Sequence, residues 1–247
     1  MKKTASVLIA LLLLIGSVAS AAEAGDFETS INFTWYSQYV GGGGFRPHKH
    51  PVLQEEALVR HLPTGYYAGI WLSQSPNGRI DFGEEENYYF GKVFRIHKVE
   101  FDLQANFIEV SKLGDLIDFT VRISAPEVTP LYWKTEYLVG TSKRSPEGGF
   151  FHKLGAAKTY SLPFGFHEQP VVLDAFIGAT NGAVGINHGI THTAVSAAFP
   201  IELGKGISLT PKFTYQYTFG GFNDGKAGHL NNQPHMKWGG VTLTYRF

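Results

Sequence analysis

The stretch Ile207–Phe219, with the sequence ISLTPKFTYQYTF, decides the fold because its side chains alternate in character with a period of two. Every second position is apolar or aromatic, and the positions between them are Ser, Thr, Lys or Gln. Successive side chains of a β-strand point to opposite faces, so this pattern predicts a strand with one apolar and one polar face. The same alternation is clear in Val99–Phe107 and in Phe27–Tyr39.

The rest of the chain repeats this pattern more weakly, which predicts about twelve strands in all. The connections between these segments tend to alternate between long and short, which is typical of an up-and-down antiparallel meander. Two connections break the rule: Ser161–Pro170 is long where a short one is expected, and Ser111–Asp115 is short where a long one is expected. The weaker segments lie near 52–61, 66–74, 82–95, 116–124, 129–139, 150–160, 171–180, 191–202 and 235–247, and the long connections are Gly41–His50, Gly140–Gly149, Asn181–Ile190 and Gly220–Pro234.

The composition of the 247 residues excludes several classes of protein. There is no Cys, so disulfide scaffolds, cysteine zinc sites and thiol catalysis are excluded. The 21 basic residues balance the 21 acidic residues, which argues against a nucleic-acid-binding surface. Charged residues are only 17% of the chain and aromatic residues reach 14%, a combination that favours β structure over disorder.

The N-terminus has the three parts of a secretory signal peptide. Lys2 and Lys3 precede the apolar run Val7–Ile15, which is too short to span a bilayer as a helix, and Ala19-Ser20-Ala21 resembles a cleavage site. We expect residues 1–21 to be removed and residues 22–247 to form a single exported domain. The mature chain would keep 19 basic residues against 21 acidic ones and be slightly acidic.

Alternation alone does not separate a soluble β-sandwich from a membrane barrel, because the apolar face packs inward in one and meets lipid in the other. Three features favour a transmembrane up-and-down antiparallel β-barrel. The clean segments have the length that a tilted strand needs to cross a bilayer. Aromatic residues gather near strand ends, as in the girdles of membrane barrels, and they include Tyr36, Tyr67, Tyr89 and Tyr132. The final strand carries apolar residues at alternate positions up to a terminal aromatic, which resembles the signal read by the barrel-assembly machinery of bacterial outer membranes; these residues are Val241, Leu243, Tyr245 and Phe247.

The stretch Trp35–Ser73 resembles the opening of the TorF family of porins. An aromatic strand is followed by the Gly- and Arg-containing segment Tyr39–Arg46, then by Pro51-Val52-Leu53-Gln54 and by Gly65–Trp71, which contains a Gly-x-Tyr-x-Gly pattern. The first loop departs from the Arg-Gly-x-Ser segment usual in that family. The resemblance covers about a fifth of the chain, and it implies an outer-membrane channel without specifying a substrate.

If the apolar faces meet lipid, the charged residues between them point into the barrel. Their mixed signs allow two interpretations: a narrow water-filled pore with opposed acidic and basic rows, or an interior closed by ion pairs. Twelve strands lie between the filled barrels of about eight strands and the open channels of sixteen or more. The candidates for lining the pore are Glu28, Arg60, Asp102, Lys134, Glu136, Lys212 and Arg246.

The sequence offers only weak candidates for metal or catalytic sites. His48 and His50 share a Gly-rich loop, but no nearby carboxylate completes a metal site, and His188 and His192 lie too far apart on an extended strand. The acidic run Glu84–Glu86 fits a charged strand end better than a cation site. The pairs His192 with Ser196 and Ser161 with His167 lack a third catalytic member, so we expect no enzyme activity, no metal and no cofactor.

The interpretation favoured by the sequence is a porin-like channel of a Gram-negative-type outer membrane, through which small polar solutes diffuse passively. Its expected partners are outer-membrane lipid, the barrel-assembly machinery and those solutes, and no nucleic acid. Two alternatives stay open at this stage. One is a non-conducting structural or adhesive barrel that acts through its external loops, and the other is a barrel enzyme that acts on lipid.

Overall fold

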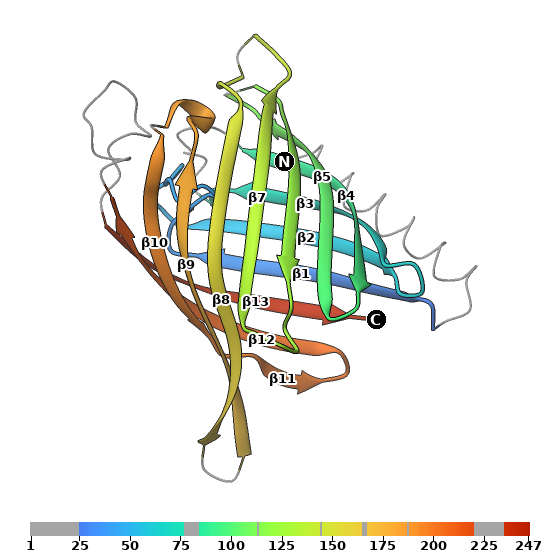
Figure 1. Ribbon diagram of the computed structural model, residues 1–247. Coiled ribbons are helices and arrows are strands. Elements are labelled where there is room, and N and C mark those ends of the chain that lie inside the picture. Colours follow the sequence, from blue (N-terminus) through green and yellow to red (C-terminus); the bar gives the residue numbers. More distant parts are fainter. Residues whose placement is uncertain are drawn as a thin grey trace.

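A computed structural model describes residues 25–76, 84–112, 114–143, 145–164, 167–186, 188–219 and 235–247. These residues form a closed antiparallel barrel of twelve strands, as the alternation predicts (Figure 1). In the part of the chain so described, no helix is long and apolar enough to cross a membrane. The predicted signal peptide, residues 1–21, lies outside the described residues.

The strands follow one another around the barrel in chain order, each antiparallel to the previous one. Their bounds are β1 Phe27–Tyr36, β2 Val52–His61, β3 Tyr66–Gln74, β4 Glu85–Ile96, β5 Val99–Val110, β6 Leu116–Ser124, β7 Leu131–Gly140, β8 Gly149–Phe164, β9 His167–Thr180, β10 Gly189–Ala198, β11 Ile201–Gly204, β12 Ile207–Thr218 and β13 Met236–Arg246.

Two pairings close the barrel. The first strand pairs with the last, β1 with β13, and β10 pairs with β12. The short β11 also pairs with β12 and continues β10 beyond Phe199-Pro200, where the Phe199 amide donates a hydrogen bond to the Pro211 carbonyl oxygen at 2.9 Å. Because β10 and β11 together occupy one place in the sheet, the thirteen segments make twelve barrel strands.

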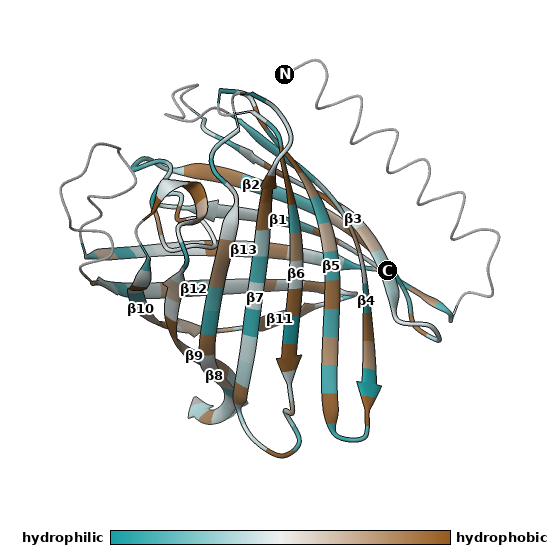
Figure 2. Cartoon of the chain, turned by 45° about the horizontal axis from the view of Figure 1, so that its top comes forward, coloured by the Kyte–Doolittle hydropathy of each residue, from teal (hydrophilic) through white to brown (hydrophobic). Residues whose placement is uncertain are grey.

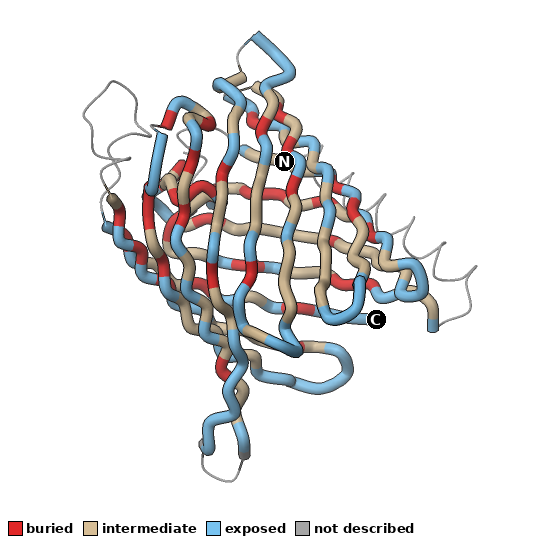
Figure 3. Tube along the Cα trace, viewed as in Figure 1, coloured by how far each residue is buried: buried red, intermediate tan, exposed pale blue. Residues whose placement is uncertain are grey.

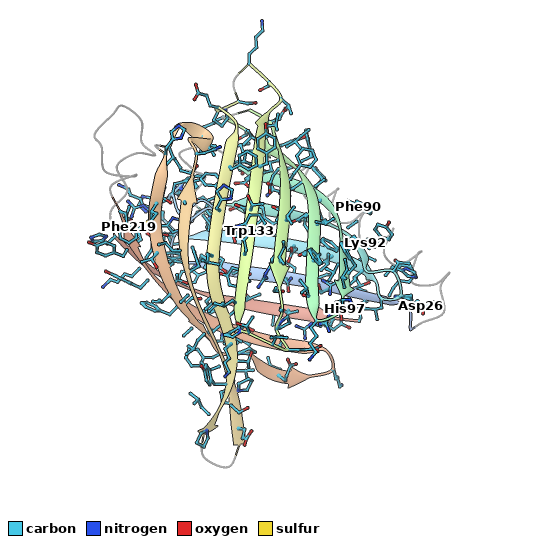
Figure 4. All side chains as sticks on the ribbon, viewed as in Figure 1. Asp26, Phe90, Lys92, His97, Trp133 and Phe219 are labelled. Carbon is cyan, nitrogen blue, oxygen red and sulfur yellow. The ribbon has the colours of Figure 1, made fainter. Side chains whose placement is uncertain are left out.

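The strand register assigns alternate residues to the inside and the outside of the barrel. Outward positions are mostly apolar and exposed, as at Trp35 and Phe213, and bands of opposite hydropathy alternate along the strands (Figure 2). Figure 3 shows the corresponding alternation of exposed and more buried residues. The rings of Phe90 and Trp133 project from this outer face (Figure 4). An apolar surface that covers the whole outside of a barrel is stable in contact with lipid and not in contact with water.

Four tyrosines point inward, and each covers a glycine on the neighbouring strand. The direct cross-strand pairs are Tyr36–Gly240, Tyr67–Gly91, Tyr89–Gly69 and Tyr132–Gly155. A Cβ atom at any of these glycines would collide with the tyrosine ring beside it. The expectation that clustered aromatic residues mark lipid-facing girdles is therefore wrong for these tyrosines, because each ring fills space that an inward glycine leaves open.

The strands β8 and β9 are longer than the sequence suggests. The segment Ser161–Pro170, expected to be a long connection, instead extends this strand pair in register as far as Phe164 and His167. The extended hairpin projects beyond the rest of the barrel at the end that carries the short turns (Figure 1). The alternation expected of a strand is disturbed here by Pro163 and Pro170, which is why the sequence resembled a loop.

The two glycines in the middle of β13 provide a matched test of the Tyr–Gly pairing. Gly240 faces inward under Tyr36, whereas the next residue, Gly239, has only the Lys212 carbonyl oxygen within reach, at 3.4 Å from an added Cβ atom. We expect Gly240→Val to destabilise the barrel by about 1–3 kcal/mol through overpacking, and Gly239→Val to be neutral. The temperature at which the folded band is lost on a gel of unheated samples measures the difference. Equal loss in both variants would contradict the pairing.

Candidate functional site: the lumen and its inward loop

A cavity of about 470 Å³ occupies the barrel interior at the end that carries the long loops. Inward side chains from β2 to β10, β12 and β13 line it together with the segment between β1 and β2. A volume of this size can hold a small ligand. Its charged lining residues are Glu85, Asp118, Glu136, Lys153, Asp174 and Lys212.

The loop between β1 and β2, residues 37–51, folds into the lumen instead of extending away from the barrel. Tyr39 and His48 form an isolated antiparallel bridge, and the Gly41 amide donates to the Phe45 carbonyl oxygen at 2.9 Å. The side chain of Gln216 on β12 donates from Nε2 to the Gly44 carbonyl oxygen at 2.6 Å. The loop is therefore tied to β12, two strands from β1 around the barrel, and narrows the interior.

A second anchor holds the same loop to β4. The Tyr39 hydroxyl donates to Glu85 Oε2 at 2.6 Å. Burial, followed by the nearby Glu85 carboxylate, raises the pKa of Tyr39 well above its ordinary value. The hydroxyl therefore keeps its proton at neutral pH and remains a hydrogen-bond donor to the carboxylate.

Glycine is required at the loop's innermost points because inward side chains occupy the space of a Cβ atom. An added Cβ atom at Gly43 would lie 2.5 Å from the Phe151 ring, and one at Gly44 would overlap the His192 ring. Gly44 also has φ +82°, in the left-handed region that glycine adopts most readily. Close approach of the backbone to the barrel wall thus explains Gly43 and Gly44.

An apolar cluster completes this constriction. Its buried members are Leu138, Phe151, Ala183 and Ile186, and the Phe45 ring packs on Phe151 with a centroid separation of 6.3 Å. Ala183 belongs to a short 3₁₀ turn, η1 (Ala183–Gly185), in the connection between β9 and β10. Two loops therefore meet inside the mouth of the barrel.

Side-chain networks run along the inner wall from the cavity toward the short turns. Tyr67 donates to Asp102 Oδ1 at 2.6 Å, and Arg60 lies over the Tyr67 ring at 5.8 Å from its centroid. A similar arrangement joins Tyr132 to Asp174 Oδ1 at 3.0 Å, with Arg122 over the Tyr132 ring at 4.7 Å. In both networks a tyrosine lies between a carboxylate and a guanidinium group.

The register places all seven predicted pore-lining residues on the inward-facing positions of their strands. Glu136 and Lys212 line the cavity, and Lys134 forms an ion pair with Glu136. That they line a conducting pore stays a prediction. The cross-strand pairs and positions are Glu28 opposite Arg60, Asp102 opposite Arg122, Lys134 opposite Lys153, Glu136 opposite Phe151, Lys212 opposite Gly240 and Arg246 opposite Ser30.

Sequence reasoning missed the inward loop and several charged members of the cavity. Lys153 on β8 lies opposite Gly178 and Asp174 on β9 lies opposite Ala157, four residues further along, and inward glycines such as Gly155 and Gly178 interrupt the alternation of these strands. The sequence did contain a signal for the inward loop, the four consecutive glycines Gly41–Gly44, because glycine often marks a place where the backbone approaches another part of the protein closely.

The candidate metal and catalytic residues do not assemble into such sites among the described residues. No group of three or more metal-binding side chains is present there, although the His48 and His50 rings lie 5.2 Å apart. His192 follows a bulge in β10, and its Nδ1 is 2.9 Å from Thr191 Oγ1. Ser196 lies four residues further along the same extended strand, about 13 Å away. The side chain of His167 lies outside the described residues.

The fold defines the class of protein: a β-barrel of the outer-membrane type. No protein-family model matches the sequence, and no curated protein matches it. The resemblance to the TorF family therefore rests on the residues given above.

Solved structures of the same class resemble the barrel over most of its length. The chain is similar to an outer membrane channel from Pseudomonas putida F1, with 8% identity, TM-score 0.52 and coverage of 92% of this chain and 97% of that one. It is also similar to the KdgM porin, with 10% identity, TM-score 0.51 and coverage of 88% and 99%. A structure titled as a bacterial polysaccharide outer membrane secretin gives 9% identity, TM-score 0.50 and coverage of 92% and 100%. At these identities the similarity shows the shared fold alone.

The contact between Gly44 and His192 predicts how the inward loop responds to substitution. Gly44→Ala should loosen the loop, because the new methyl group overlaps the His192 ring and the backbone is in the left-handed region. Amide hydrogen exchange at Gly41 and Gly44 should speed up by about tenfold. Adding His192→Ala removes the overlap and should restore part of the protection. Unchanged exchange in the single variant would show that the loop is not held by this contact.

Proposed function

We propose that the protein is a narrow outer-membrane channel for passive diffusion of small polar solutes. The observation that carries the proposal is a cavity with six charged lining residues, narrowed by an inward loop, inside a barrel whose outer face is apolar. A barrel that served only as an anchor has no need for a water-accessible chamber. The similarity of fold to porins and channels supports the same function.

The inward loop provides the test. The hydrogen bond from Gly41 to Phe45 brings the two ends of the segment together, so deleting Gly42–Gly44 can join them with little strain. We expect discrete conductance steps from the purified protein in planar bilayers, and steps about twofold larger from the deletion variant. Lys49→Ser, an exposed change in the same loop, is the control and should leave the conductance unchanged.

A non-conducting structural barrel is the second candidate. The interior hydrogen bonds of Asp102 and Asp174, together with the Lys134–Glu136 ion pair, are the observations that favour it, because side chains bound to one another can close a lumen. Absence of conductance from both the wild-type protein and the loop deletion would support this candidate and reject the channel. Conductance only after deletion would mean that the loop is a plug.

We also propose that the barrel-assembly machinery of the outer membrane recognises the outward row of β13, formed by Val241, Leu243, Tyr245 and Phe247. Phe247 is already part of the closed sheet through two backbone hydrogen bonds to Thr29, at 3.1 and 3.2 Å. Phe247→Ala keeps these backbone groups and removes only the ring. We expect it to refold in detergent like the wild type but to reach the outer membrane in severalfold smaller amounts. Normal amounts in the membrane would reject recognition through this ring.

A further inference from the structure

The charged residues that line the cavity are distributed unevenly by sign around the barrel. On β4–β6 the charged lining residues are Glu85 and Asp118, both acidic. On β7–β12 the lining contains Lys153, Lys212, Glu136 and Asp174, and Lys134 pairs with Glu136, so three positive charges stand against two negative ones on this side.

The strand order places Lys212 on the wall opposite the acidic residues, whereas Lys153 on β8 lies only two strands from Asp118 on β6. In the closed ring, β12 lies six strands from β5 in either direction, so Lys212 faces the wall that holds Glu85 and Asp118. Lys212 forms no ion pair or hydrogen bond to any residue within the described ranges, although it is exposed to the lumen. Its charge is therefore available to a solute.

The acidic wall also presents hydrogen-bond acceptors that the described protein groups leave unused. Asp118 is 8% exposed, and its Oδ2 accepts from Thr120 at 3.1 Å while its Oδ1 has no protein partner. Asn87 donates through Nδ2 to Glu85 at 3.1 Å, which directs its own unpartnered Oδ1 away from that bond. Buried acceptors of this kind are normally satisfied, so this wall suits a ligand rich in N–H donors.

We infer that the cavity is a selectivity site for small zwitterionic solutes, with the ammonium group of the solute toward Glu85 and Asp118 and its anionic group toward Lys212. This inference rests on the proposed channel function. Opposite charges on facing walls produce an electric field across the lumen. A solute that carries both charges interacts favourably with the wall at each of its ends. A neutral isomer of equal size gains at neither end, and a narrow lumen with low-dielectric walls strengthens the difference.

Alanine and lactamide test the inference, because they are isomers of the same size and only alanine is a zwitterion. In proteoliposome swelling, corrected for protein-free liposomes, the alanine-to-lactamide rate ratio of the wild-type protein should be about threefold higher than that of Lys212→Glu. Glu85→Gln should lower the same ratio, while its carbonyl oxygen can still accept the Tyr39 hydrogen bond. Lys98→Met removes a positive charge from an exposed turn outside the cavity and should leave the ratio unchanged.

The outcomes separate the two proposals. If the wild-type protein shows no conductance and no swelling with either solute, the channel function is wrong. If it conducts but the ratio is the same in the wild type, Lys212→Glu and Glu85→Gln, the selectivity site is wrong and the channel function stands. Lactamide swelling that persists in all variants confirms that the substituted barrels are folded and open.

Discussion

The structure depends on one constraint: within a lipid bilayer every backbone N–H and C=O group must find a partner in the protein itself. A sheet satisfies this only if it has no edge, and here the pairings of β1 with β13 and of β10 with β12 remove both edges. The continuation of β10 by β11 keeps the sheet paired even where the strand is interrupted. The chain passes through Phe199-Pro200, where proline has no amide to donate, yet resumes pairing with β12 on the other side.

Closure with twelve strands creates an interior that the inward side chains of the strands do not fill by size alone. Two different arrangements occupy the remaining space at the two ends of the barrel. Toward the short turns, tyrosine rings lie over glycines and hydrogen-bond to carboxylates, as Tyr67 does with Gly91 and Asp102. Toward the long loops, the backbone itself enters the lumen, and its glycines pass close to Phe151 and His192. The cavity is the space that remains between these two layers.

The sequence predicted the fold well because period-two alternation reports directly on the two faces of a strand. Lys212 and Glu136 could be assigned to the inner face from their position between apolar neighbours alone. The alternation carries no information about which inward residues meet across the lumen, since that depends on barrel order and register. It also misjudged Tyr67 and Tyr89, because an aromatic ring suits either the lipid interface or the space over an inward glycine.

Two charged groups near the cavity illustrate why pairing matters more than composition for what a lumen can recognise. Glu136 is as well placed as Asp118 to meet a solute, but its charge is compensated by Lys134 on the same strand. Lys212 has no such neighbour on its own strand, where the adjacent inward residues are Thr210 and Thr214. A compensated charge contributes little field across a lumen, whereas an uncompensated one acts on whatever passes. Glu136 and Lys212 therefore differ in what they can do to a solute because of their inward neighbours on the strand. Glu136 has a neighbour of opposite charge, and Lys212 has threonines.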